Sequence, residues 1–330
     1  DLAHNRREGV IMRKLFILAV LAGGIVAAGA TGATARPLGT NGKIVTNSDN
    51  LVTGEEQVYA VDPDGSDRHL VANNSEVGQW SPDGSLLALF GEGGERLFNP
   101  DTGASRDVGL PDTHYPGLLL FCGVWSPDGA RLACEGFGAE DSTLNGVYTV
   151  RSSDGGDLQR VTSDPNGDDC PSDYSPNGKQ LVVTRANDNE YGLFTVKVHG
   201  GDLRQITPDG MEFNFCNGSW SPQGNEILFS AHVPDGGHHS SIWVVHTDGS
   251  GLRQIPVPGC GGTNDDPTAI GCFSPTWSPD GRKILFARRR GNEQADLYTA
   301  HADGNGLFQV TNTPDIDESG GDWGTHPVTP

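Results

Sequence analysis

Acidic side chains gather in a few short stretches of this sequence, and they are the residues best suited to binding or chemistry. The eight that we single out as ligand-binding candidates are Glu76, Asp168, Asp169, Asp173, Asp315, Asp317, Glu318 and Asp322. Oxygen-only ligand sets suit Ca²⁺ or Mg²⁺, and a concentrated negative field attracts basic groups on a partner. The alternative is that they are solvated loop acids, since no stretch has the spacing of an EF-hand. Asp265-Asp266 forms one further acidic pair.

Other residue patterns that could carry catalysis are weak, and we predict no catalytic residue. The sequence has no Gly-x-Ser-x-Gly nucleophile elbow. His199-Gly200-Gly201 resembles part of an oxyanion hole, but it stands where comparable segments have Asp-Gly turns, and we interpret it as a turn. His238-His239 could bind a metal ion, although an adjacent pair in an exposed loop is usually just solvated.

The composition favours short strands joined by turns and argues against anionic partners. The 330 residues include 47 Gly and 21 Pro, and 22 Lys+Arg stand against 43 Asp+Glu, a formal net charge of −21. Turn residues at this frequency fit many short strands. Because the charge is strongly negative, we expect no nucleic-acid partner and no anionic membrane partner. Cations or basic protein surfaces suit the chain better.

We interpret the first 35 residues as lying outside the folded domain. Residues 1–11 are interpreted as an upstream over-extension, because Met12 begins the pattern of a secretory signal at residues 12–35. Two basic residues precede an apolar stretch, and Ala33-Thr34-Ala35 is a small-x-small cleavage site. An uncleaved membrane anchor is the alternative. We expect an exported protein that is secreted, periplasmic or at the cell surface and has no stable membrane span after cleavage.

One phrase organises the rest of the chain: an aromatic residue, Ser, Pro, Asp or a related residue, and Gly, followed by a short apolar strand. Full copies begin at Trp80, Trp125, Tyr174, Trp220 and Trp277, and Trp323 begins a degenerate copy. These aromatic anchors are 45, 49, 46, 57 and 46 residues apart. A period near 45 residues is typical of propeller blades or solenoid units.

The phrase is suited to a tight turn between antiparallel strands. Pro fixes φ at the second position of a type I turn, Ser suits the first position, and Asp or Asn suits the third. Gly suits the fourth position, where φ must be positive. The aromatic residue before the turn is large enough to fill the space between neighbouring sheets. We therefore predict that the anchors pack between blades rather than form a ligand platform.

Strand-forming segments recur in a fixed order after each anchor, as at 283–286, 297–300 and 307–311. Six such sets are present, and the segment around Trp323 matches the strand that the first set lacks. We predict one all-β domain within 36–330, folded over about 38–327. Its fold is a six-bladed β-propeller of four-stranded antiparallel blades, closed by a C-terminal strand that completes the first blade. Closure of this kind removes exposed sheet edges.

Six cysteines behind a secretory signal indicate three disulfides, although sequence alone leaves their pairing open. The pairs that blade positions favour are Cys122–Cys134, Cys170–Cys216 and Cys260–Cys272. The first pair flanks an anchor turn nearly symmetrically, and the last could close a glycine-rich loop. Cys170 and Cys216 each lie four residues before their anchor, in adjacent blades. The spacing does not fit a zinc site.

The repeat from Trp277 to Thr311 contains Trp-Ser-Pro-Asp-Gly, Lys-Ile-Leu-Phe, Leu-Tyr, Asp-Gly and Gln-Val-Thr in that order. It resembles the TolB-like propeller repeat, also called the PD40 or WD40-like repeat, over nearly all of the chain after the leader. The resemblance implies a propeller, and TolB itself is a periplasmic protein whose propeller binds a peptidoglycan-associated lipoprotein. TolB carries an α/β domain before its propeller, whereas in this chain we expect the propeller directly after the signal. Similar propellers precede the catalytic domain of prolyl oligopeptidase-type enzymes, and we see no such domain in this sequence.

Two hypotheses for function follow. The preferred one is a secreted or periplasmic TolB-like propeller that binds a protein or cell-envelope component on one face and does no chemistry, as a monomer that requires no cofactor. The alternative is a divalent-cation-dependent hydrolase or lyase with its site at the mouth of the propeller channel. In that case the acidic residues would hold the ion, for which Ca²⁺ is our candidate. The sequence does not identify the ligand or the face that binds it.

Overall fold

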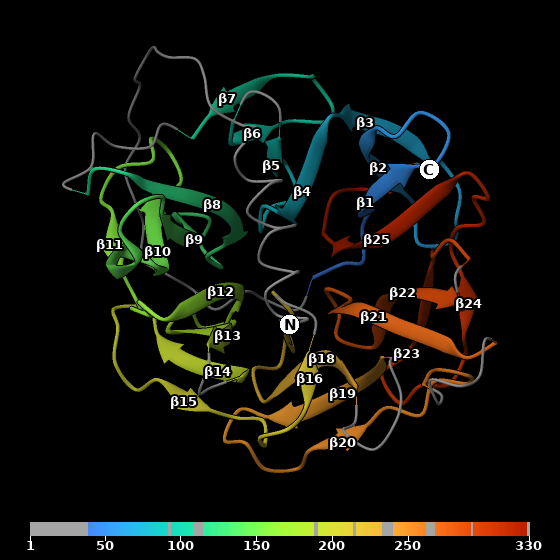
Figure 1. Cartoon of the computed structure of the whole chain (residues 1–330). Helices are drawn as coiled ribbons and strands as arrows, with labels where there is room; N and C mark the ends of the chain where they lie inside the picture. The colour runs from blue at the N-terminus through green and yellow to red at the C-terminus, as the bar shows by residue number, and fades with distance from the viewer. Residues whose placement is uncertain are drawn as a thin grey trace.

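The computed structural model describes residues 39–91, 94–108, 115–187, 191–213, 216–232, 240–261, 268–291 and 293–328. These residues form six small antiparallel sheets arranged as blades around a central axis (Figure 1). Within the described ranges the only helical element is a short 3-10 helix, η1 (Ser142–Leu144), and no helix there is long and apolar enough to cross a membrane. The predicted over-extension and signal lie outside the described residues.

The first three blades each contain four strands, which follow one another from the axis outward. Blade 1 consists of β25 (Ile316–Trp323), β1 (Ile44–Asn50), β2 (Glu56–Val61) and β3 (His69–Asn73). Blade 2 consists of β4 (Ser75–Trp80), β5 (Leu87–Gly91), β6 (Arg96–Phe98) and β7 (Ser105–Asp107). Blade 3 consists of β8 (Leu118–Trp125), β9 (Arg131–Gly138), β10 (Gly146–Arg151) and β11 (Gln159–Arg160).

The other three blades repeat this order, with one interruption. Blade 4 consists of β12 (Gly167–Tyr174), β13 (Gln180–Asn187), β14 (Tyr191–Lys197) and β15 (Arg204–Gln205). The inner strand of blade 5 is in two pieces, β16 (Glu212–Phe213) and β17 (Ser219–Trp220), followed by β18 (Glu226–His232), β19 (Ser241–His246) and β20 (Arg253–Gln254). Blade 6 consists of β21 (Ile270–Trp277), β22 (Lys283–Arg290), β23 (Asp296–His301) and β24 (Phe308–Gln309).

The last strand of the chain completes the first blade, as predicted. β25 pairs with β1 in antiparallel register from Ile44 opposite Trp323 to Asn50 opposite Ile316. Figure 1 shows the red β25 beside the blue β1. Around the axis the inner strands lie side by side in the order β25, β4, β8, β12, β17, β21 and again β25. The sequence-based expectation of a six-bladed ring closed by a C-terminal strand is therefore confirmed.

The core lies between the blades. One cluster joins Val45 and Val58 of blade 1 to Val77, Trp80 and Leu87 of blade 2. The second strands of blades 3 to 6 each contain a run of consecutive buried residues, such as Leu181, Val182 and Val183 in β13, which explains the apolar runs in the sequence. All six aromatic anchors are at most 8% exposed, so they pack between blades as expected.

The Ser-Pro-Asp-Gly turns have the expected geometry. In the first copy, the N–H of Gly84 donates to the carbonyl oxygen of Ser81 at 2.8 Å, and Gly84 has a φ of +74°. The Ser81 hydroxyl donates to Asp83 and accepts from the N–H of Leu86, so the Ser side chain joins the turn to the next strand. A side chain other than Gly at this position would be strained, because φ is positive there.

Ring closure predicts the effect of a substitution in β25. The Trp323 side chain is 2% exposed and its Nε1–H donates to the carbonyl oxygen of Gly42 at 2.9 Å. We expect Trp323→Ala to lower the free energy of unfolding by about 3–5 kcal/mol, as for large buried aromatic side chains in general. Urea denaturation monitored by circular dichroism measures this. Phe308→Ala is the control, because Phe308 is 44% exposed and surface changes usually stay within about 0.5 kcal/mol. Equal effects for both would contradict this account of closure.

Candidate functional site

The two ends of the channel differ in the kind of residue that surrounds them. Inner strands end at the aromatic anchors and the Ser-Pro-Asp-Gly turns, and we call this end the anchor face. They begin at the opposite end, the loop face, where the hairpin 51–55 between β1 and β2 also lies. The eight predicted acids do not converge on one mouth, because they occupy both ends of the inner strands.

Asp173 and Asp322 lie at the anchor face, each directly before an aromatic anchor. Both contribute to a cavity of about 50 Å³ on the axis, lined mostly by the anchors and the turn prolines of the blades. The Gln79 side chain spans this region, since its amide nitrogen donates to the Ser172 carbonyl oxygen at 3.3 Å, from blade 2 to blade 4. A cavity of this size holds a few water molecules.

The same position carries a recurring hydrogen bond between blades. The carboxylate of Asp322 accepts from the backbone N–H of Trp80, and that of Asp173 accepts from Trp220, both at 2.8 Å. Gln79 and Ser219 act in the same way toward the next blade, at 3.3 Å. Asp173 also accepts from the N–H of Tyr174 at 2.8 Å. These two predicted acids therefore hold neighbouring blades together.

Asp169 forms a buried ion pair inside blade 4. Its carboxylate accepts from Nε and Nη2 of Arg185, both at 2.8 Å, and Asp169 is 1% exposed. A second buried acid, Asp164, lies 3.6 Å from the same guanidinium. Because Asp169 and Arg185 face each other across the β12–β13 pair, this carboxylate is part of the fold rather than an open ligand.

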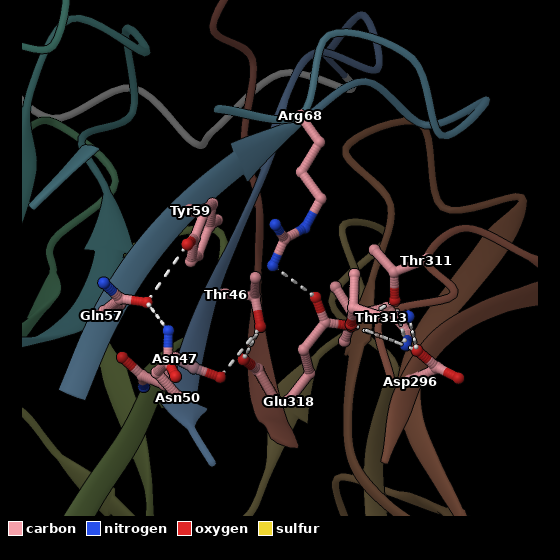
Figure 2. A network of polar contacts seen from close by, with 12 residues as sticks. Thr46, Asn47, Asn50, Gln57, Tyr59, Arg68, Asp296, Thr311, Thr313 and Glu318 are labelled. Carbon is pink, nitrogen blue, oxygen red and sulfur yellow. Dashed lines mark hydrogen bonds and ion pairs between the residues drawn. The ribbon is translucent and has the colours of Figure 1, made fainter. Parts of the chain in front are cut away.

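Glu318 is fully buried between blades 1 and 6. Figure 2 shows it between Arg68 on one side and Thr311 and Thr313 on the other. Arg68 donates to Glu318 at 3.3 Å and stacks its guanidinium 3.7 Å above the Tyr59 ring. Thr311 and the N–H of Leu297 donate to the second carboxylate oxygen. Burial raises the pKa of Glu318 above its usual range, against the effect of the Thr311 and Arg68 contacts.

Asp317 also has a positively charged partner from another blade. Both of its oxygens accept from Nη2 of Arg289 on β22, and one accepts from the N–H of Ala295 at 2.8 Å. Glu76 and Asp168 are half-buried near the loop-face ends of β4 and β12, and neither lacks an interaction partner. Of the eight predicted acids, only Asp315 is exposed.

Asp315 belongs to a small exposed patch on the loop face. Its carbonyl oxygen accepts from the N–H of Leu51 at 2.9 Å, which places it beside the β1–β2 hairpin. Asp49 and Glu55 flank the same hairpin and are exposed. Leu51 and Val52 at its tip are 57% and 76% exposed. We call the set Asp49, Leu51, Val52, Glu55 and Asp315 the blade-1 patch.

The three disulfides have the pairing that blade positions favour. Cys122 is bonded to Cys134 across β8 and β9, Cys260 to Cys272, and Cys170 to Cys216 between blades 4 and 5. Among the described residues the one group of three metal-type ligands is Glu135, Cys170 and Cys216. The predicted acids form no such group there. His238-His239 and Asp265-Asp266 lie outside the described residues.

Sequence analysis did not single out Glu95, which lies between β5 and β6. Its carboxylate accepts a hydrogen bond from the N–H of Cys122 in blade 3, and its other oxygen is buried without a partner among the described atoms. Burial raises the pKa of Glu95 to about 8, although the residue as a whole is only half-buried. A Gly-rich segment gives no sequence signal that its Glu turns inward.

The ion pair in blade 4 allows a test of whether Asp169 stabilises the fold or is available to bind a ligand. We expect Asp169→Asn to lower the free energy of unfolding by about 3 kcal/mol, because it removes the charge that faces the buried Arg185 guanidinium at two hydrogen bonds. Asp315→Asn is the matched control and should change stability by less than about 0.5 kcal/mol. Urea denaturation of both variants measures the two changes in the free energy of unfolding. A small effect at Asp169 would show that its carboxylate is not needed for folding.

Glu95 predicts a pH dependence of stability. Between pH 4.5 and about 8 the folded protein keeps a proton on Glu95 that the unfolded chain has lost, so stability falls as pH rises, by at most about 1.4 kcal/mol per unit. Glu95→Gln removes this loss. We expect it to stabilise the protein more at pH 8 than at pH 5 in urea denaturation. Glu140→Gln, at an exposed position, is the control, and a pH-independent effect of the first substitution would contradict the assignment.

Relatives in sequence cover only part of this chain. No family model matches it. It is 27% identical over 152 residues to an uncharacterized protein of Agrobacterium fabrum, and 27% identical over 128 residues to the Tol-Pal system protein TolB of Anaeromyxobacter dehalogenans. The first match covers 43% of this chain and 46% of the relative, and the second covers 39% of this chain and 26% of the relative. The chain thus spans less than half the length of the curated relatives that it matches.

Solved structures match a larger share of the fold. TolB from Acinetobacter baumannii superposes with a TM-score of 0.66 at 20% identity, over 86% of this chain and 66% of that one. A candidate TolB from Agrobacterium tumefaciens gives 0.62 at 18% identity, over 86% and 99%. An oligogalacturonate lyase in complex with manganese gives 0.53 at 13% identity, over 78% and 71%. At these identities the likeness concerns the fold alone. With its six closed blades and its TolB relatives, the chain is a TolB-like β-propeller.

Proposed function

We propose that this chain is an exported binding module that holds a protein or cell-envelope component on its loop face and catalyses no reaction. Two general features support the proposal. The chain is similar to TolB in sequence and fold, and its three disulfides are typical of proteins in oxidising compartments. The observation that carries it is the blade-1 patch, where exposed apolar side chains stand among exposed acids.

The tip of the patch is held in a fixed conformation. The N–H groups of Val52 and Thr53 both donate to the Asn50 side-chain oxygen at 3.0 Å, and the N–H of Gly54 donates to the Asn50 carbonyl oxygen at 2.7 Å. Leu51 and Val52 are thus presented by a hairpin that is already ordered. A preorganised contact loses less conformational entropy on binding than a flexible one.

The charges of the patch define the partner that would fit it. The neighbouring Asp317 is paired with Arg289, so the acids that the patch exposes are Asp49, Glu55 and Asp315. A partner with an apolar pocket rimmed by Lys or Arg would bury the two apolar side chains of the tip and meet these carboxylates at the edge. Complementary rim charges raise the association rate and depend on salt. The proposed partner is therefore a basic protein surface rather than a nucleic acid or an anionic membrane.

The enzymatic alternative has weaker support. The lyase neighbour shares the fold at 13% identity, and the acids of the described channel residues are mostly occupied by Arg side chains or backbone N–H groups. Ca²⁺ enters the proposal only as an ion that exposed carboxylates of the patch could share with a partner. Binding that survives a chelator would assign the contact to the protein side chains.

A charge-matched pair of variants tests the binding face. Residues 36–330 would be immobilised and exposed to solubilised envelope extract at low salt and at about 0.5 M salt, where surface charges are screened. We expect Asp49→Asn, Glu55→Gln and Asp315→Asn together to weaken capture of a defined protein by roughly tenfold at low salt. The control removes as many charges from anchor-face turns, with Asp64→Asn, Asp248→Asn and Asp303→Asn.

The results separate three cases. Loss with the patch variant alone supports the loop face, and a further loss with Leu51→Ser and Val52→Ser supports the apolar contact. Equal weakening by both triple variants would indicate only the overall negative charge. If the unmodified chain captures no protein at either salt concentration, the binding-module proposal is wrong.

A further inference from the structure

Three consecutive blades bring sulfur and carboxylate ligands together. Cys170 on β12 of blade 4 is bonded to Cys216 of blade 5, and Glu135 approaches them from β9 of blade 3. A carboxylate oxygen of Glu135 and the two sulfurs all lie within 4.8 Å of one another. Thiolate and carboxylate are both zinc ligands. The disulfide thus occupies a place where, once reduced, two thiols and an acid would face each other.

Accessibility distinguishes this disulfide from the other two. Cys216 is exposed, whereas Cys122 and Cys134 are at most 1% exposed, and in the third pair Cys260 is half-buried and Cys272 fully buried. Exchange begins with attack of a thiolate on an accessible sulfur. Cys216 also has a φ of +58°, a backbone conformation that residues other than Gly rarely adopt. Breaking the bond would release this residue, so the inter-blade disulfide is the one most open to reduction.

We propose that Cys170–Cys216 is a reducible cross-link and that its reduced form, with Glu135, binds one Zn²⁺. A dithiol reductant supplies two electrons and two protons, which yields two thiols in the protein and one disulfide in the reductant. Zn²⁺ then displaces the two thiol protons and accepts both thiolates and the carboxylate, with water at the remaining position. In a tetrahedral site the sulfurs part to about 3.8 Å. One covalent link between blades 4 and 5 is exchanged for a metal link that also reaches blade 3.

The first experiment measures the order of reduction. The full chain is titrated with tris(2-carboxyethyl)phosphine, trapped with N-ethylmaleimide and mapped by peptide mass spectrometry. We expect Cys170 and Cys216 to be labelled at reductant concentrations at least threefold below those that label the other four cysteines. If Cys122–Cys134 or Cys260–Cys272 is reduced first, the proposal of a selective cross-link is wrong.

The second experiment measures zinc itself. After selective reduction and removal of the reductant, we expect one Zn²⁺ per chain by atomic emission and protection of Cys170 and Cys216 from N-ethylmaleimide. The oxidised chain should bind none at this site. Glu135→Gln should weaken zinc binding at least tenfold, whereas Glu140→Gln, an exposed control on the same blade, should leave it unchanged.

Two further outcomes would overturn the metal site. The first is equal zinc binding by the Glu135→Gln and unmodified chains. The second is unfolding of the reduced chain, monitored by tryptophan fluorescence, because the site requires the three blades to stay in place. The Cys170→Ser and Cys216→Ser double variant, which lacks the bond from the start, checks this independently. If it is folded but binds as much zinc as the reduced chain, the metal lies elsewhere.

Discussion

The antiparallel pairing of β25 with β1 is the interaction on which the rest of this structure depends. It joins residues more than 260 positions apart, such as Ile44 and Trp323, so the chain must close a very long loop before the pairing forms. Once it forms, the ring has no first or last blade with an open inner edge. The contacts that β25 carries depend on this closure, among them the ion pair of Glu318 with Arg68 inside blade 1 and its hydrogen bonds with Thr311 and Leu297 of blade 6.

The repeats explain why the fold could be predicted from the sequence. Each aromatic anchor and each Ser-Pro-Asp-Gly turn is a local signal, and its physical cause lies within a few residues, as the Ser81, Asp83 and Gly84 contacts show. The Cys170–Cys216 disulfide has a related cause, since these two cysteines occupy equivalent positions of adjacent repeats. Equivalent positions of adjacent blades lie side by side, so counting from the anchors favours this inter-blade pair.

The acids could be located along their strands but not assigned their partners. Arg289 pairs with Asp317 from another blade, and Arg68 reaches Glu318 across 250 positions of sequence. A long basic side chain can reach several nearby acids, and the packing around it decides which one it pairs with. The spacing of residues along the sequence does not contain this information. Glu95 could not be recognised for a related reason. Its carboxylate is buried because blade 3 packs against it, and nothing in the sequence near Glu95 indicates this contact. Because several of these acids are paired with Arg side chains, the channel is less negative than the net charge of the chain suggests.

The chain segments on either side of the closing pair leave it at the same end. β1 begins and β25 ends at the anchor face, where Ile44 lies opposite Trp323. A pulling force applied to the two segments would therefore open the pairing like a zipper, one hydrogen-bonded pair at a time, rather than shear all pairs at once. The disulfide between blades 4 and 5 lies far along the chain from this point and would not share the load. A tether or an unfolding motor that pulled on these two segments would therefore load the β1–β25 pair first and open it at a lower force than shearing would need.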